Sequence, residues 1–111
     1  MELNKILDAQ RAFFASGATL DIDFRISKLK LLKDTVKQYE AEIATALKSD
    51  LGKSEFESFM CEIGLVYDEL SYMIKHTRKL AAEKTVHTPL VNFASHSYTK
   101  PTPYGDRKSV V

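Results

Sequence analysis

Residues 54–74, "SEFESFMCEIGLVYDELSYMI", decide the fold class because they combine a helix start with a long apolar face. Ser54 and Glu57 have the spacing of a capping box, in which the serine hydroxyl accepts from the Glu57 N–H and the glutamate accepts from the serine N–H. The apolar residues that follow at helical spacing are Phe56, Phe59, Met60, Ile63, Val66, Tyr67, Leu70, Met73 and Ile74. The pattern predicts a helix from residue 54 to about residue 80, with an apolar face wide enough to contact more than one neighbour.

Two residues inside this predicted helix need an explanation. Gly64 costs roughly 1 kcal/mol relative to alanine in a helix interior, which indicates the close approach of another backbone. Cys61 is the single cysteine of the chain and lies beside Glu62 in the middle of the helix. A lowered thiol pKa needs a helix N-terminus or a cationic neighbour, so we interpret Cys61 as a structural residue and not as a nucleophile.

Two further helices are predicted upstream. Residues 2–16 have apolar side chains near helical spacing, and Gly17 supplies a left-handed stop. After a short link, Asp21 or Asp23 can cap a second helix. Its apolar stripe consists of Leu29, Leu32, Val36, Tyr39, Ile43 and Leu47. Gaps of three and four residues match the helical repeat, so we expect one uninterrupted helix along this stripe.

The chain changes character after Glu83, where Thr, Ser, Val and Tyr are frequent and prolines stand at positions 89, 101 and 103. Proline disfavours helix both at its own position and at the preceding residue. We expect an extended tail with one or two short strands, at residues 91–93 and 96–100. The predicted fold class is therefore mainly α, with three amphipathic helices followed by this tail. The boundaries fall at 1–83 for the helical segment, 84–105 for the extended segment and 106–111 for a divergent end.

Composition excludes several classes of function. The 111 residues carry a formal net charge of +1, which gives no global attraction to nucleic acid or to an anionic membrane. No run approaches the ~18 apolar residues of a membrane span. The single cysteine and the charged residues near the N-terminus, such as Lys5 and Arg11, lead us to expect a cytoplasmic protein. The basic residues of the second helix fit a solvated face better than a phosphate-binding stripe, because no aromatic residues alternate with them.

No motif in the sequence indicates an active site or a metal site. His76, His87 and His96 stand eleven and nine residues apart, without a second cysteine or an HxxxH pair, so a metal site is not favoured. Asp68 and Glu69 are adjacent on a helix and point in different directions, which suits solvent better than acid–base chemistry. The four isolated glycines form no phosphate-binding loop.

Three blocks of the sequence carry a resemblance to a known family. They read "QRAFFASGATLDIDFRISKLKLLKDTV" at 10–36, "ALKSDLGKSEFESFMCEIGLVYDELSYMIKH" at 46–76 and "TPLVNFASHSYTKPTPYG" at 88–105. In this order they resemble the N-terminal segment of NAD(P)-dependent aldehyde dehydrogenases, in the branch that contains dimeric and fatty-aldehyde enzymes. The resemblance implies an incomplete part of an α/β aldehyde dehydrogenase fold. In that fold, helices lie against the cofactor domain and the extended chain begins the strand-rich oligomerisation region.

The same resemblance implies that the catalytic parts of the family lie elsewhere. The family uses a cysteine thiolate from a later domain, which Cys61 does not match. Asn92 does not match the oxyanion-stabilising asparagine, which follows a Pro-Trp pair. We therefore assign no catalytic, cofactor-binding or metal residue, and we expect this chain alone to be inactive and to bind no NAD or NADP. The sequence "DRKSVV" after Gly105 departs from the family pattern, and we expect a truncated gene model, an alternative transcript or a frame change there.

Two functions follow from these observations. In the first, the chain is part of an aldehyde dehydrogenase, and its partners are the remainder of the dehydrogenase fold or further copies of itself. In the second, it is a stand-alone helical module that binds the parent enzyme or another protein through an apolar face, since wide apolar faces can mark partner sites. That face contains Phe56, Phe59, Ile63 and Leu70.

Overall fold

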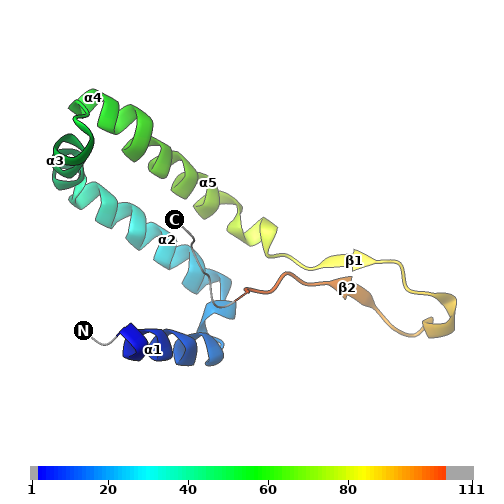
Figure 1. Cartoon of the computed structure of the whole chain (residues 1–111). Coiled ribbons are helices and arrows are strands. Elements are labelled where there is room, and N and C mark those ends of the chain that lie inside the picture. Colours follow the sequence, from blue (N-terminus) through cyan, green and yellow to red (C-terminus); the bar gives the residue numbers. More distant parts are fainter. Residues whose placement is uncertain (1–2, 105–111) are drawn as a thin grey trace. The chain divides into compact units, whose positions relative to one another are not determined.

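The computed structural model describes residues 3–104 and divides into two compact units (Figure 1). One unit is drawn from Met1–Arg25 and Arg78–Val111, and the other is Ile26–Thr77. None of the helices formed by residues 3–104 has the length and apolar character that a membrane crossing requires. The predicted departure from the family pattern, after Gly105, lies outside the described residues.

The described residues are mainly helical, as the sequence predicts, and they end in a two-stranded antiparallel hairpin. The elements in chain order are α1 (Leu3–Ala15), η1 (Ala18–Leu20), α2 (Ile22–Gln38), α3 (Glu40–Leu51), α4 (Glu55–Ser58), η2 (Phe59–Ile63), α5 (Gly64–Leu80), β1 (Lys84–Val86), η3 (Leu90–Asn92) and β2 (Ser97–Thr99). Here η1 and η3 are 3₁₀ helices and η2 is a π-helix.

The first helix ends where the sequence predicts. Gly17 follows α1 with φ 77°, a left-handed conformation that a residue without Cβ adopts at little cost. The carboxylate of Asp21 accepts the N–H of Asp23 at 2.9 Å and so caps the start of α2. The rings of Phe13 and Phe24 lie 5.9 Å apart between centroids, which joins α1 to the first turn of α2.

The second predicted helix is in fact two helices, so the expectation of one uninterrupted helix was wrong. Tyr39 interrupts the helix with φ −99° and ψ 13°, although it still donates to Thr35 O at 3.1 Å and accepts from Ile43 N at 2.9 Å. No proline or glycine stands at this point. The interruption coincides instead with a tertiary contact, because the next residue, Glu40, accepts a hydrogen bond from the hydroxyl of Tyr67 at 2.7 Å.

The third predicted helix begins at the capping box that the sequence indicates. Ser54 Oγ accepts from the Glu57 N–H at 3.2 Å, and the Glu57 carboxylate accepts from the Ser54 N–H at 3.0 Å. Because the N–H and the hydroxyl of Ser54 both donate to this carboxylate, the pKa of Glu57 lies below its ordinary value. The helix then continues through α4, η2 and α5 to Leu80, with one π turn that the sequence pattern did not predict.

We predict that Ser54→Ala destabilises the α4–η2–α5 helix by about 0.5–2 kcal/mol, the usual cost of losing an N-cap hydroxyl. Hydrogen exchange followed residue by residue should accelerate from α4 into the start of α5 and stay unchanged in α1. Ser49→Ala, on the exposed end of α3, is the matched control. Equal acceleration in α1 and α4 would contradict a local capping role.

The buried core is small and lies along one side of the α4–η2–α5 helix. Among residues 3–104, the buried apolar side chains are Ile63 and Leu70, and the buried polar residues are Ser58 and Thr77. Four residues of the predicted apolar face are exposed instead, namely Phe56 at 74%, Phe59 at 43%, Met60 at 54% and Val66 at 44%. For the three residues before Ile63, the prediction was wrong because the π turn adds one residue to the turn and changes which side chains face inward.

The two strands of the tail pair with each other. β1 and β2 are antiparallel, with Lys84 opposite Thr99 and Val86 opposite Ser97. The strand expected at residues 96–100 is confirmed as β2, whereas the strand expected at residues 91–93 is wrong. Residues there form η3, because Pro89 starts a tight turn in which Asn92 N donates to Pro89 O at 2.8 Å. β1 was not predicted from the sequence.

Candidate functional site

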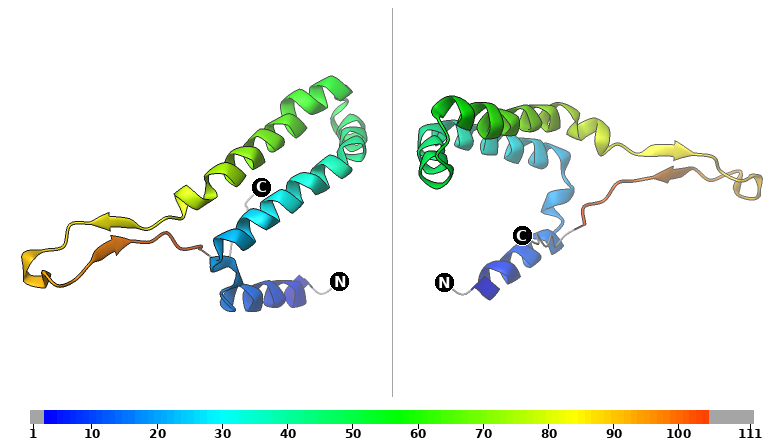
Figure 2. Two further views of the ribbon diagram at one scale, coloured as in Figure 1. Left: turned by 180° about the vertical axis from the view of Figure 1, so that it is seen from behind. Right: turned by 45° about the horizontal axis from the view of Figure 1, so that its top comes forward.

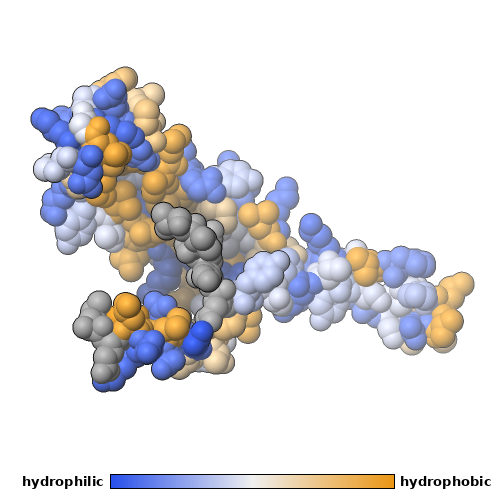
Figure 3. All heavy atoms as spheres, in the orientation of Figure 1, coloured by the Kyte–Doolittle hydropathy of each residue, from blue (hydrophilic) through white to orange (hydrophobic). Residues whose placement is uncertain are grey.

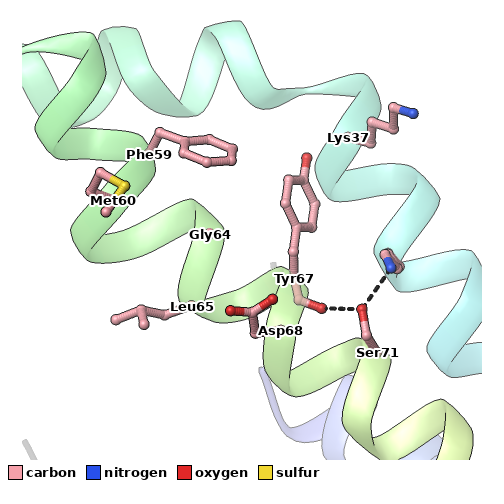
Figure 4. A pocket seen from close by; sticks show the side chains of 9 residues that line it. Lys37, Phe59, Met60, Gly64, Leu65, Tyr67, Asp68 and Ser71 are labelled. Carbon is pink, nitrogen blue, oxygen red and sulfur yellow. Dashed lines mark hydrogen bonds between the residues drawn. The ribbon is translucent and has the colours of Figure 1, made fainter.

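A groove in the second unit is lined by both apolar and charged side chains. Within that unit, α2 and α5 run antiparallel and are joined through α3 and α4 (Figures 1 and 2). The groove has a volume of about 520 Å³, within the range of ligand-sized clefts. Its lining consists of Lys33, Lys37, Phe59, Met60, Gly64, Leu65, Tyr67, Asp68 and Ser71 (Figure 4). We call it the α2–α5 groove.

One side of the α2–α5 groove is apolar and the other carries a chain of hydrogen bonds. The rings of Phe59 and Tyr67 lie 6.4 Å apart and are tilted by 58°. Lys33 Nζ donates to Ser71 Oγ at 2.7 Å, and Ser71 Oγ donates to the backbone carbonyl of Tyr67 at 2.5 Å (Figure 4). The ammonium group of Lys33 therefore joins α2 to α5.

The Tyr67 hydroxyl is the polar group most affected by its surroundings. It donates to the Glu40 carboxylate at 2.7 Å. This hydrogen bond, together with desolvation and the negative charge of Glu40, raises the pKa of Tyr67 to about 12. A proton held this tightly is unsuited to acid–base exchange near neutral pH. The contact instead connects the start of α3 to the middle of α5.

We predict that Tyr67→Phe lowers the urea midpoint of the chain near neutral pH. Because the folded pKa lies above the ordinary value of 10, the stabilising hydrogen bond is fully present below pH 10 and is lost as pH rises through about 12. The difference between Tyr67→Phe and the parent chain should therefore shrink across that interval. Tyr72→Phe, at an exposed tyrosine on the same helix, is the control and should show no such convergence.

Cys61 lies in η2 and its side chain is exposed, so a role in core packing does not explain why a cysteine stands at this position. The Lys53 ammonium nearby is paired with the carboxylate of Glu62, and that hydrogen bond raises the pKa of Lys53. The cation is therefore committed to a carboxylate and does not stand free beside the thiol. The non-catalytic interpretation of Cys61 stays a prediction.

The other candidate residues are separated or engaged locally. His76 stacks on Tyr72 with centroids 4.1 Å apart, and its Nδ1 lies 2.8 Å from the Tyr72 carbonyl. His96 stacks on Tyr98 of β2, in the other unit. Within residues 3–104, no three side chains of the metal-binding types gather closely enough to hold an ion. Asp68 and Glu69 are both exposed, and only Asp68 of the two lines the α2–α5 groove.

The hairpin of the first unit presents a second surface. Leu90, Val91 and Phe93 are 86%, 91% and 86% exposed, and they stand together in and beside η3. Figure 3 shows apolar residues gathered at this end of the hairpin. We call these three residues the hairpin tip. At the open end of the hairpin, Lys100 forms an ion pair with Glu83 at 3.1 Å.

Known proteins share both the sequence and the structure of this chain. It is 40% identical over 95 residues to 4,4'-diaponeurosporen-aldehyde dehydrogenase of Staphylococcus aureus, a match that covers 86% of this chain and 21% of the relative. It is 35% identical over 85 residues to the dimeric NADP-preferring aldehyde dehydrogenase of Canis lupus familiaris, covering 77% of this chain and 19% of the relative. No family model matches the sequence.

The structural match decides the relationship. The chain superposes on the substrate-bound state of Staphylococcus aureus AldH with a TM-score of 0.83 and 36% identity, over 94% of this chain and 23% of that one. The chain is homologous to the N-terminal portion of aldehyde dehydrogenases. The described helices and hairpin are thus part of an aldehyde dehydrogenase fold, and this chain spans about a fifth of the length of the curated dehydrogenases that it matches.

The sequence pattern did not predict the contacts that build the α2–α5 groove. Tyr67 and Glu40 are 27 residues apart, and Lys33 and Ser71 are 38 apart. The only available signal was a tyrosine within an apolar stripe, since a tyrosine hydroxyl usually finds a hydrogen-bond partner when its ring packs. That signal does not indicate that Glu40 is the hydrogen-bond partner of Tyr67.

Proposed function

We propose that this chain is the N-terminal structural segment of an NAD(P)-dependent aldehyde dehydrogenase, an oxidoreductase that converts aldehydes into carboxylic acids. The segment supplies packing surfaces and no catalytic or cofactor-binding residue. The observation that carries the proposal is the superposition of 94% of the chain on an aldehyde dehydrogenase at 36% identity. NAD or NADP would then be the cofactor of the whole enzyme, as the name of the canine relative indicates for that protein.

The positions of the two residues with possible catalytic chemistry support the structural role. Cys61 is exposed on η2 beside an ion pair. Asn92 ends η3 at the exposed end of the hairpin, where its N–H donates to Pro89 O. Both residues are exposed, and neither lines the α2–α5 groove. The proposal includes a cytoplasmic location, which a single cysteine favours.

The partners in this proposal are the remainder of a dehydrogenase fold or further copies of the chain. The exposed apolar side chains of α4 and η2 and the hairpin tip are surfaces that such partners would cover. A stand-alone helical interaction module is the second candidate. The small core of the second unit argues against it, because an independent module needs more buried apolar surface than Ile63 and Leu70 supply among the described residues.

We predict that the purified chain gives no aldehyde-dependent reduction of NAD or NADP, because a scaffold segment supplies neither the thiolate nor the dinucleotide site. Absorbance of reduced cofactor is the measurement, with the Cys61→Ser variant as control. Activity that grows with protein concentration and is lost in Cys61→Ser would contradict the proposal.

A complementation experiment separates the two candidate functions. The chain is co-expressed with the Staphylococcus aureus dehydrogenase from which the matching fifth has been removed. Restored aldehyde oxidation that requires both parts supports the dehydrogenase segment. If activity is not restored, and the chain alone is a cooperatively folded monomer, the interaction module is the better reading.

A further inference from the structure

The π turn at η2 sets which side chains enter the core of the second unit. Gly64 N–H donates to Phe59 O, five residues earlier, whereas an α-helix would use Met60 O, four residues earlier. The buried residues along the helix are Ser58, Ile63, Leu70 and Thr77. Their spacing is five, then seven and seven, so the interval of five falls across the π turn. An uninterrupted α-helix would instead place Phe59, four residues before Ile63, on the inner side.

The π turn buries the polar side chain of Ser58 and leaves the apolar side chain of Phe59 partly exposed. Ser58 is fully buried, and its hydroxyl has no hydrogen-bond partner among the described residues. A buried hydroxyl without a partner opposes folding. Phe59, the next residue, is 43% exposed, so a large apolar side chain remains partly in water. The helix thus carries two unfavourable features that a shift of one residue would remove.

Gly64 is what permits the π turn. Its backbone has φ −62° and ψ −40°, which any residue adopts, so glycine is not required for conformation. A Cβ at this position would lie 2.8 Å from the Phe59 carbonyl oxygen, a backbone atom that cannot move without breaking the turn. Alanine would therefore oppose the π turn, although alanine is the most favourable residue in a regular α-helix.

We propose that the segment from Ser58 to Gly64 is a one-residue register switch. In the π register, Ser58 is inside and Phe59 lines the α2–α5 groove. In the α register, Gly64 N–H moves to Met60 O, Phe59 turns inward and Ser58 turns to solvent. Glycine at position 64 removes the steric obstacle to the π register, whereas alanine would favour the α register. This inference goes beyond the proposed function, because it concerns a conformational equilibrium within the segment itself.

Thiol labelling measures the register directly. In a Cys61→Ser background, Ser58→Cys and Phe59→Cys are prepared separately, each with Gly64 and with Gly64→Ala. With Gly64, we expect the thiol at 59 to react faster than the thiol at 58. With Gly64→Ala, the order should reverse, with the ratio of rates changing by roughly tenfold or more. Leu65→Ala, at an exposed neighbouring position, should leave the order unchanged.

Deletion of Cys61 provides a second test of the proposed register switch. The deletion removes the extra residue of the π turn, so Ser58 comes to lie four positions before Ile63. In a regular α-helix its side chain would then stay buried. In that background, Gly64→Ala should not expose position 58. An unchanged labelling order in Gly64→Ala would overturn the switch. Loss of helical circular dichroism in Gly64→Ala would overturn it as well, because the α register would then not be accessible.

Discussion

Ile63→Ala is expected to lower the free energy of unfolding by about 2–5 kcal/mol, the range for truncating a buried aliphatic side chain. Ile63 is 3% exposed, and it shares the apolar core with Leu70 alone among residues 3–104. Domains have a total stability of roughly 5–15 kcal/mol, so this loss is a large share. We expect the variant to be largely unfolded at temperatures where the parent chain is folded. Urea unfolding followed by far-ultraviolet circular dichroism measures the effect.

The control for this prediction is Val66→Ala in the first turn of α5. Val66 is much more exposed than Ile63, so its truncation should stay near the roughly 0.5 kcal/mol typical of surface changes. Similar losses of unfolding free energy in both variants would contradict a core centred on Ile63. A loss confined to Ile63→Ala supports a small core centred on the junction of η2 and α5.

The second large effect is expected in the oligomeric state. We predict that the chain is helical but associates as concentration rises, and that it binds dyes that report exposed apolar surface. The hairpin tip leaves three apolar side chains almost fully exposed, and a two-stranded hairpin is marginal by itself. Replacing Leu90, Val91 and Phe93 with serine should weaken association by tenfold or more. Burying one such side chain contributes about 1.5–3 kcal/mol, and 1.4 kcal/mol corresponds to tenfold.

Sedimentation at several protein concentrations measures this association. The matched control replaces three exposed leucines outside the hairpin, Leu31, Leu32 and Leu51, with serine. If that variant dissociates as readily as the hairpin-tip variant, association is a general property of exposed apolar surface and not of the tip. A parent chain that stays monomeric at high concentration, with cooperative melting and no dye binding, would contradict the prediction and favour the stand-alone module.

The sequence by itself determined the features that depend on neighbouring residues. The stop at Gly17 follows from one residue that tolerates positive φ, and the start at Ser54 follows from two side chains three positions apart. The helical class of the chain up to Leu80 and the change to extended structure after Glu83 follow from periodicity and proline content. The absence of a recognisable catalytic motif stays a prediction from the sequence.

The tertiary structure alone decided the features that depend on distant residues. The break at Tyr39 accompanies the bond between Glu40 and Tyr67, and no local signal marks it. The π turn buries Ser58 in place of Phe59, although the apolar pattern predicts the reverse. β1 exists only because β2 supplies its hydrogen bonds. The physical reason is the same in each case. Helix caps and turns are made within a few residues, whereas burial, strand pairing and grooves depend on which distant segment comes to lie beside them.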